Sequence, residues 1–431
     1  MRSSRRNIIL ALSSGILLAG CGVEINDTSH DTSQALSEAP DQVLEWNKTA
    51  LQIFPSPQNP LFAFRWLAML HSSIFDAVNG VSGNYEAFIV NERAPAGSDE
   101  NAAAAGAGYY TLTHLPYAPA LTAEQLKIIT DHYDSLPPSI TGNPGFAFGE
   151  NVAAQVFANR ADDGAPTVGF TIYHAPCEGQ PGCWVPQPTP AGTPAPTLVA
   201  TWGNQRTWVL NDVTQFYAEP PPALDSEVYL KDLAEVQDVG RRTMTSRTPG
   251  QTDIAMFWVA ASWAIWSPVA RSVSEARGLS IAENARLFGL LNVAAADTYT
   301  NTWNVKFHYN FWRPITAIQA TGVTDWLPLL PATPPFPEYT SGHTSGSGAY
   351  AEVLTEFFGD NPGVRMLAHS STNLGFDHYW TTLSEAVDEV IDARVYSGIH
   401  FRNSDVVGAR FGKTIARYVV KHAMRDNPGH R

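Results

Sequence analysis

Three separated segments near the C-terminus of the chain carry residue types that could together hold a tetrahedral oxyanion. In chain order these residues are Lys306 and Arg313, then Ser341, Gly342 and His343, then Arg394 and His400. Arginine forks and lysine point charges make the charge-assisted hydrogen bonds that a phosphate-like ion needs. The whole chain has a formal charge of -14, so the three cations do not follow from a basic composition. The segments therefore predict one anion-binding site.

The position of each residue type indicates how it would act. Ser341 and Gly342 stand at the predicted start of a helix, where free backbone amides and the helix dipole favour an anion. His343 follows in the first turn and could serve as an acid or a base at the edge of the ligand. Each motif alone is common by chance, so the signal is the combination of the three spacings.

Helical patterns dominate the chain around these segments. Apolar residues at helical spacing predict a helix over residues 61–78, and an alanine-rich run predicts a closely packed helix over residues 101–115. Capping boxes at Thr122, Ser280 and Thr382 predict three more helix starts. Further helices are expected over residues 146–162, 226–239, 252–266, 341–358 and 404–423. Clean strand alternation is rare, so the predicted fold class is mainly α.

Residues 163–222 differ from the helical parts because Pro, Gly and Thr dominate there. They predict a Pro/Gly-rich loop excursion with a short hairpin, which could form a lid. Cys177 and Cys183 flank a short stretch of turn formers within this excursion. In an oxidising compartment the two cysteines are expected to form a disulfide. The alternative is a metal site completed by a residue such as His174.

The N-terminus has the pattern of an export signal. Arginines among residues 1–6 precede an apolar run over residues 8–18, which is too short to span a membrane. The sequence Leu-Ala-Gly-Cys that ends at Cys21 resembles the lipobox of bacterial lipoproteins, in which the signal peptide, here residues 1–20, is removed and the cysteine is lipidated. An ordinary secretory signal is the alternative. Either signal predicts export to the periplasm or cell surface, and the lipobox adds membrane attachment through Cys21 alone.

The rest of the chain divides into a tether and one domain. Residues 21–45 are rich in Ser, Asp and Thr and predict a flexible tether. Residues 46–431 predict one large helical catalytic domain, with its anion site within residues 303–405. The acidic balance argues against nucleic-acid binding, which usually needs a basic surface, but a local pocket can still bind a small anion.

The order and spacing of the three segments resemble the signature shared by vanadium-dependent haloperoxidases and type-2 phosphatidic-acid phosphatases. That signature is a Lys, six residues and Arg-Pro, then Pro-Ser-Gly-His, then Ser-Arg, five residues and His. The resemblance covers residues 303–405, about a quarter of the chain, and implies two helical bundles that share one core. His400 would be the vanadium ligand or nucleophile, and His343 the general acid–base. The residues implied to hold the oxyanion are Lys306, Arg313, Ser341, Gly342, Arg394 and His400.

Further matches favour the haloperoxidase branch of this superfamily. They are Trp303 three residues before the Lys, Phe311 and Trp312 ahead of the Arg-Pro, Phe336 at the start of a Phe-Pro-x-Tyr stretch, and Phe401 and Arg402 after the last His. Membrane phosphatases of the superfamily have several spanning helices, which the pattern of this chain does not predict. Trp303 and Phe336 would line the halide side of the site. The alternative is that both are core aromatics of a large helical protein.

On this resemblance the protein is an oxidoreductase that acts on peroxide as acceptor. Vanadate would be its cofactor, in a site that phosphate can also occupy, and Lys306 would assist catalysis beside His343 and His400. The substrates would be hydrogen peroxide and a halide, bromide or chloride, which is oxidised to hypohalous acid. The sequence leaves open whether an organic acceptor takes the halogen.

The chain departs from the signature at supporting positions. Thr340 replaces the usual Pro, and Ala393 replaces the usual Ser. The Asp that normally follows the last His by four residues lies one residue later, at Asp405, so the carboxylate behind His400 is not assigned. A carboxylate that would support the acid–base His is expected soon after Phe257 and Trp258, but residues 260–262 are Ala, Ala and Ser.

Two other functions could use the same residues. A phosphomonoesterase (acid phosphatase) would use His400 as a nucleophile through a phosphohistidine intermediate, since vanadate mimics phosphate. A non-catalytic surface protein would keep the scaffold only to bind phosphate or a partner. His343 and His400 argue against this second alternative, because simple anion binding needs neither histidine at these positions.

Overall fold

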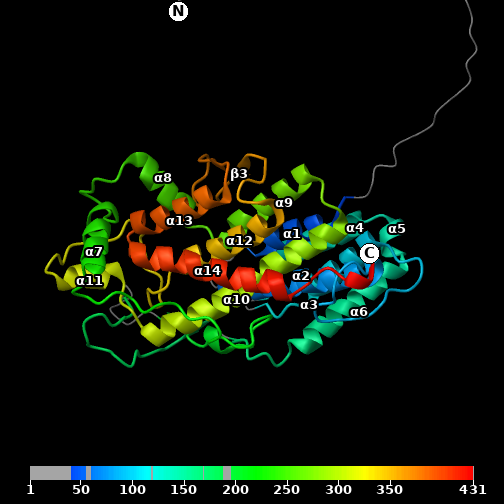
Figure 1. The fold of residues 1–431 in the computed structure, drawn as a ribbon, viewed down its shortest axis with the longest axis horizontal. Helices are drawn as coiled ribbons and strands as arrows, with labels where there is room; N and C mark the ends of the chain where they lie inside the picture. The colour runs from blue at the N-terminus through cyan, green and yellow to red at the C-terminus, as the bar shows by residue number, and fades with distance from the viewer. Residues whose placement is uncertain (1–39, 55–59, 118–119, 168, 188–195, 431) are drawn as a thin grey trace, which may run out of the picture. The chain divides into compact units, whose positions relative to one another are not determined.

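The structure is a computed structural model that describes residues 40–54, 60–117, 120–167, 169–187 and 196–430 (Figure 1). Residues 40–431 cluster into one unit, separate from residues 1–39. The predicted signal peptide, the predicted lipid-anchor residue Cys21 and most of the predicted tether lie outside the described residues. The end of the tether prediction is wrong. Asp41 already caps helix α1 (Gln42–Ile53), because its side chain accepts the first backbone N–H groups of that helix.

The first half of the domain is a helical bundle around an alanine-rich helix. Its helices are α1, α2 (Pro60–Ser82), α3 (Glu100–His114), α4 (Ala123–Ser135), α5 (Pro138–Thr141) and α6 (Pro144–Asn159). Small residues let α3 pack backbone to backbone against α6. A Cβ atom on Gly149 would lie only 2.1 Å from the carbonyl oxygen of Ala103. The predicted close packing of the alanine-rich segment is confirmed.

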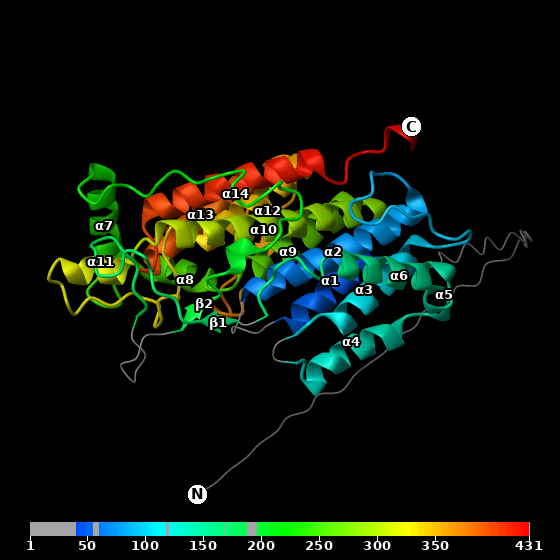
Figure 2. The ribbon, with the colours of Figure 1, turned by 90° about the horizontal axis from the view of Figure 1, so that it is seen from below.

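The second bundle carries the three predicted site segments. Its helices are α7 (Glu227–Val239), α8 (Pro249–Phe257), α9 (Ser262–Arg277), α10 (Ile281–Tyr309), α11 (Pro314–Ala320), α12 (Gly342–Phe358), α13 (Leu383–Tyr396) and α14 (Arg402–His422). A hairpin of β3 (Met366–Ala368) and β4 (His378–Trp380) connects α12 to α13, and a 3-10 turn, η2 (Pro428–His430), follows α14. α10 packs against α2 of the first bundle and against α12 and α14 of the second (Figure 2). The two bundles therefore share one apolar core, and the predicted mainly α fold is confirmed.

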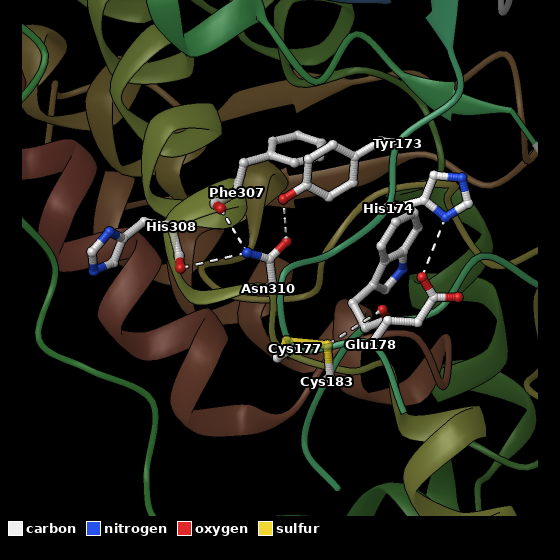
Figure 3. The surroundings of a disulfide bond; sticks show 9 residues. Tyr173, His174, Cys177, Glu178, Cys183, Phe307, His308 and Asn310 are labelled. Atoms are coloured by element: carbon white, nitrogen blue, oxygen red, sulfur yellow. Dashed lines mark hydrogen bonds and ion pairs between the residues drawn. A yellow bond between two sulfur atoms is a disulfide. The ribbon is translucent and has the colours of Figure 1, made fainter. Parts of the chain in front are cut away.

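Residues 163–222 form the predicted loop excursion, as far as the structure describes it. The excursion contains a short antiparallel hairpin, β1 (Phe170–Thr171) with β2 (Thr197–Leu198), and a 3-10 turn, η1 (Trp202–Asn204). The expected disulfide joins Cys177 to Cys183, whose Cα atoms lie 5.7 Å apart (Figure 3). Because both sulfur atoms are used in this bond, the alternative of a metal site at these cysteines is wrong.

Helix starts with a local side-chain cap follow the sequence closely. Thr122, Ser280 and Thr382 each form the predicted capping box, at the starts of α4, α10 and α13. The end of α2 differs from the end predicted from the sequence. This helix continues to Ser82, because the side chain of Asn79 bonds the backbone of Tyr85 and does not end the helix.

The helix predicted over residues 252–266 is two helices. α8 and α9 meet across residues 258–261, where the axis bends by 88°. At this corner the carbonyl oxygen of Trp258 accepts a hydrogen bond from the side chain of Arg394, at 2.7 Å, instead of one from a next helical turn. α2 and the bent pair α8–α9 are the described helices with enough apolar length to cross a membrane. The apolar window of α2 lies wholly inside the protein.

The last helix also begins elsewhere than predicted. α14 starts at Arg402, whereas the sequence placed its cap at Ser404. Its first N–H groups are satisfied from distant parts of the chain. The carboxylate of Glu338 accepts the N–H of Phe401, and that of Asp232 accepts the N–H of Asn403. These caps lie far away in sequence, so a local pattern could not show them.

Candidate active site

The structure brings together all seven residues that the sequence singled out for the anion site. They lie at helix ends: Lys306 and Arg394 in the last turns of α10 and α13, Arg313 before α11, Ser341, Gly342 and His343 at the start of α12, and His400 before α14. The three cations and His400 are buried, with at most 2% of their surface exposed. The charges of all three cations reach His400, since each of them lowers its pKa.

Lys306 is held by backbone carbonyl groups rather than by a carboxylate. Its Nζ donates to the carbonyl oxygens of Pro337 (3.1 Å) and Glu338 (2.8 Å) and lies 5.1 Å from the centre of the Phe336 ring. Burial, followed by the charge of Arg313, lowers the pKa of Lys306 well below its ordinary value. A bound anion would oppose this shift, because it would supply the negative charge that the ammonium group lacks.

Arg313 keeps one part of its guanidinium free. Its Nε donates to the carbonyl oxygen of Phe336 (3.1 Å), and its Nη1 donates to that of Ile399 (2.9 Å) and lies 3.2 Å from Nε2 of His400. Its Nη2 is buried and has no hydrogen-bond partner among the described residues. Burial lowers the pKa of Arg313 to about 9, although the charge of Glu338 opposes the shift. Nη2 is therefore available to an anionic ligand.

The corner between α8 and α9 orients two more residues of the site. Arg394 donates from Nη1 to the carbonyl oxygen of Trp258 (2.7 Å), and its buried Nε is unpartnered in the described part of the chain. Burial and then the charge of Arg394 lower the pKa of His343 well below its ordinary value, and hydrogen bonds to the backbone of Ala260 and Val259 oppose this shift. His343 is therefore neutral, and backbone groups take the place of the carboxylate that is absent from this corner.

Glu338 is a functional residue that the sequence analysis missed. Its fully buried carboxylate accepts hydrogen bonds from Nδ1 of His400 (2.7 Å) and from the backbone N–H of Phe401 (3.1 Å). When this carboxylate is ionised it can only accept, so Nδ1 then carries the proton and Nε2 of His400 keeps its lone pair. Burial, then the charges of Arg313 and Lys306, lower the pKa of His400 well below its ordinary value, so the ring is neutral.

Asp405, the carboxylate that follows His400 in the sequence, is not the hydrogen-bond partner of this histidine in the structure. It is fully buried, and burial raises its pKa well above the ordinary value, while the hydroxyl of Ser341 and the charge of Arg394 oppose the rise. Burial also raises the pKa of Glu338 to about 7. Glu338 thus supports the histidine, whereas the two carboxylate oxygens of Asp405 have no hydrogen-bond partner among the described residues.

The site holds more buried positive charge than buried negative charge. Three cations, Lys306, Arg313 and Arg394, face two carboxylates, Glu338 and Asp405. The two arginines add N–H groups that have no partner among the described residues, and the N-terminus of α12 adds further hydrogen-bond donors. A tetrahedral oxyanion needs this set of donors and this excess of charge, so the residues present fit vanadate and phosphate.

A small pocket reaches the two histidines of the site. Its volume is about 60 Å³, room for on the order of four water molecules, so it admits a small ion. Its lining is mostly apolar and includes both predicted aromatics, Trp303 and Phe336, and two that were not predicted, Phe64 and Tyr299. Leu198 of β2 also lines the pocket, so the loop excursion borders the site.

Known proteins share both the site segments and the fold. Residues 286–428 match the family model described as the VCPO second helical-bundle domain. The crystal structure of a bacterial vanadium-dependent iodoperoxidase superposes on 90% of this chain and 96% of its own, with a TM-score of 0.74 and 26% identity. The described fold therefore resembles that of a vanadium-dependent iodoperoxidase, and residues 286–428 resemble the second helical bundle of this family. In this structure the carboxylate that accepts a hydrogen bond from His400 is Glu338.

Two further vanadium haloperoxidases resemble this chain more distantly. The vanadium chloroperoxidase of Curvularia inaequalis is 25% identical over 191 residues, which are 35% of this chain and 31% of that protein. The matched part thus spans about a third of that relative's length. A holo-type bacterial vanadium-dependent chloroperoxidase has a TM-score of 0.69 at 15% identity, over 87% of this chain and 96% of its own. This second likeness concerns the fold.

Proposed function

We propose that the protein is a vanadium haloperoxidase, which uses vanadate to oxidise a halide with hydrogen peroxide and releases a hypohalous acid equivalent. One observation carries the proposal. A neutral His400, oriented by Glu338, presents the lone pair of Nε2 inside a buried cradle of three cations. The iodoperoxidase and chloroperoxidase relatives support the same class of reaction.

Vanadate would be held by charge and by one bond from a histidine. The three cations of the site would compensate the charge of its oxygen atoms, helped by Ser341 and by the backbone amide of Gly342 at the start of α12. Nε2 of His400 would ligate the metal. When bound, vanadate supplies a Lewis acid that activates peroxide for attack by a halide, without a change in its oxidation state.

His343 is placed to move the proton that this reaction requires. The ring is neutral because burial and Arg394 lower its pKa, so Nε2 can accept a proton from hydrogen peroxide as the peroxide binds. The protonated ring then returns the proton to the oxygen that leaves once the halide has been oxidised. The charge of Arg394 makes the imidazolium a stronger acid and so favours this return.

The apolar lining of the pocket determines which halide enters most readily. Phe64, Tyr299, Trp303 and Phe336 offer an ion little hydration. Removing an ion from water costs more free energy when the ion is small and strongly hydrated. We therefore place iodide and bromide ahead of chloride as substrates of this enzyme.

The same cradle favours hydrolysis of a phosphomonoester as a second candidate function. A phosphoryl group has the charge and shape of vanadate, and the lone pair on Nε2 of His400 could attack it. His343 would then protonate the leaving alcohol. The observation that favours this candidate is the orientation of His400 by Glu338, which leaves Nε2 unprotonated.

Two assays on purified protein that lacks residues 1–21 and is stripped of phosphate separate these candidates. The first follows peroxide-dependent oxidation of iodide, bromide and chloride, with and without added orthovanadate. The second follows hydrolysis of an aryl phosphate. Halide oxidation that appears only with vanadate is the expected result. Hydrolysis that vanadate inhibits, without halide oxidation, would replace the proposed function by the second candidate.

We also propose that the protein is exported and attached to a membrane through a lipidated Cys21. The support is the lipobox-like sequence that ends at this residue and the disulfide, a bond that persists in oxidising compartments. Mass spectrometry of the mature N-terminus tests this proposal. The expected N-terminus is a lipid-modified Cys21, whereas an unmodified Cys21 or a different first residue would contradict it.

A further inference from the structure

The turn between Lys306 and Arg313 determines how these two cations of the site lie relative to each other. α10 ends at Tyr309, and Asn310 follows in the left-handed conformation, with φ of 49°. Asparagine tolerates this conformation better than most residues, because its short side chain can hydrogen-bond locally. Two more residues complete the turn before Arg313. Any shift at Asn310 therefore changes the spacing of the two cations.

The disulfide loop, Cys177–Cys183, hydrogen-bonds directly to this turn. The N–H of Trp184 donates to the carbonyl oxygen of Asn310 (2.7 Å), and the N–H of Trp312 donates to the carbonyl oxygen of Gly182 (2.9 Å). The two bonds form a short antiparallel bridge. The two bonds therefore hold the turn on either side of Phe311, at Asn310 and at Trp312.

Side chains also hold this turn, as Figure 3 shows. The hydroxyl of Tyr173 donates to Oδ1 of Asn310 (2.8 Å), and the Tyr173 ring meets that of Phe307 edge-on at 4.9 Å between centroids. Nδ2 of Asn310 donates to the carbonyl oxygen of Phe307 (2.7 Å). The left-handed residue is therefore fixed by both its backbone and its side chain, and the loop excursion supplies both contacts.

The other side of the turn contacts the machinery of the site. The N–H of Glu338 donates to the carbonyl oxygen of Phe311 (2.9 Å). The carboxylate of Glu338 orients His400, and its carbonyl oxygen accepts a hydrogen bond from Lys306. The turn thus lies between the disulfide loop and the residue that aligns the histidine. A displaced turn would disturb Arg313 and Glu338 together.

The disulfide loop depends on its cross-link for order. The loop contains Gly179 and Gly182, with φ of 84° and 87°. Glycine reaches these values easily but has many other conformations available, so such a sequence is poorly ordered by its backbone alone. The disulfide restricts the chain on both sides of Gly182, whose carbonyl oxygen is the acceptor for the turn.

We propose that the disulfide loop is a positioning element of the oxyanion site. By holding the turn at Asn310, the bond between Cys177 and Cys183 fixes Arg313 relative to Lys306 and so sets the affinity for a tetrahedral oxyanion. The proposal rests on the oxyanion site of the proposed function but not on halide oxidation. The two cysteines act through the turn and contact no ligand.

Phosphate binding to the whole chain tests this proposal. Calorimetric titration with inorganic phosphate compares the native protein with the double variant Cys177→Ser/Cys183→Ser. We expect binding to weaken by about tenfold or more, because a misplaced guanidinium loses the net value of a hydrogen bond to a charged group. Val152→Ala, at a fully buried position of α6 in the first bundle, is the control. It should lower the melting temperature and leave the phosphate affinity unchanged.

A second variant keeps the disulfide and removes one contact. Tyr173→Phe lacks the 2.8 Å hydrogen bond to Asn310 and should weaken phosphate binding by about two- to tenfold. An unchanged phosphate affinity in a folded double variant would overturn the proposal. If the double variant does not fold, an unchanged affinity in Tyr173→Phe would overturn it. Native protein that binds phosphate but oxidises no halide would overturn the proposed function alone.

Discussion

Replacing Glu338 by Gln separates two effects that the carboxylate has on a bound anion. The amide keeps an oxygen that can accept the hydrogen bond from Nδ1 of His400, so the local shape is retained. Loss of the charge removes a repulsion of about 2 kcal/mol, for a unit charge at ~7 Å across the ring and an effective dielectric constant of ~20. The same loss weakens Nε2 of His400 as a ligand, and losing the partner of a metal-bound histidine typically lowers metal affinity about 10- to 100-fold.

Phosphate and vanadate should therefore respond differently to Glu338→Gln. Phosphate is held by charge and should bind more tightly, by up to about thirtyfold if the whole electrostatic effect appears. Removing the repulsion should also favour vanadate binding, but vanadate additionally depends on its bond to His400. The ratio of vanadate affinity to phosphate affinity should therefore fall by about 10- to 100-fold. Calorimetric titration with both ions at one pH measures this ratio.

Asp405→Asn is the matched control for this experiment. Asp405 is also fully buried at the site, but His400 is hydrogen-bonded to Glu338 instead. Removing the charge that Asp405 carries at the chosen pH should change the affinity for both ions alike and leave their ratio unchanged. If the ratio in Glu338→Gln also stays at the native value, the reasoning is refuted, because Glu338 would then act only as a charge and not through the histidine.

Three further predictions follow from the same geometry. Sulfate keeps its charge around neutral pH, so its affinity should rise as the pH falls through about 7, where buried Glu338 takes up a proton. A titration of Glu338→Gln that still shows the rise would contradict this assignment. His343→Gln should keep its vanadate affinity while kcat falls by about 10²- to 10⁴-fold. Steady-state kinetics and a parallel vanadate titration measure the two quantities. An equal fall in kcat and in vanadate affinity would contradict the role of His343 as an acid–base. Removing the disulfide, which closes a sequence separation of 6, should lower the free energy of unfolding by about 2 kcal/mol. Denaturant unfolding measures this change. Equal free energies of unfolding for the native protein and the variant would argue against a disulfide that orders its loop.

Features with local causes could be predicted from the sequence. The capping boxes at Thr122, Ser280 and Thr382 involve partners three residues away, so the pattern itself contains the interaction. The cations and histidines of the site could be named because their types and spacings are specific to oxyanion chemistry. The disulfide was predictable because its two cysteines enclose one short loop.

Features with distant causes could not be predicted in this way. Glu338 contacts His400 from 62 positions earlier in the chain, and nothing beside Glu338 marks that partner. The corner at residues 258–261 supports Arg394 and His343 through backbone groups. Every residue has a backbone carbonyl, so a sequence pattern cannot show which of them will be used. Arg394 and His343 are therefore supported at this corner by backbone groups, although residues 260–262 contain no carboxylate.

Vanadate-dependent halide oxidation by His400→Ala tests the central claim most directly. His369→Ala, which changes an exposed histidine outside the site, serves as the control. Native protein and His369→Ala should oxidise iodide and bromide with peroxide only after orthovanadate is added. His400→Ala should show no such activity at any vanadate concentration, although its buried cations should still bind phosphate. Vanadate-dependent oxidation that persists in folded His400→Ala would contradict the claim that Nε2 of His400 holds the catalytic vanadate.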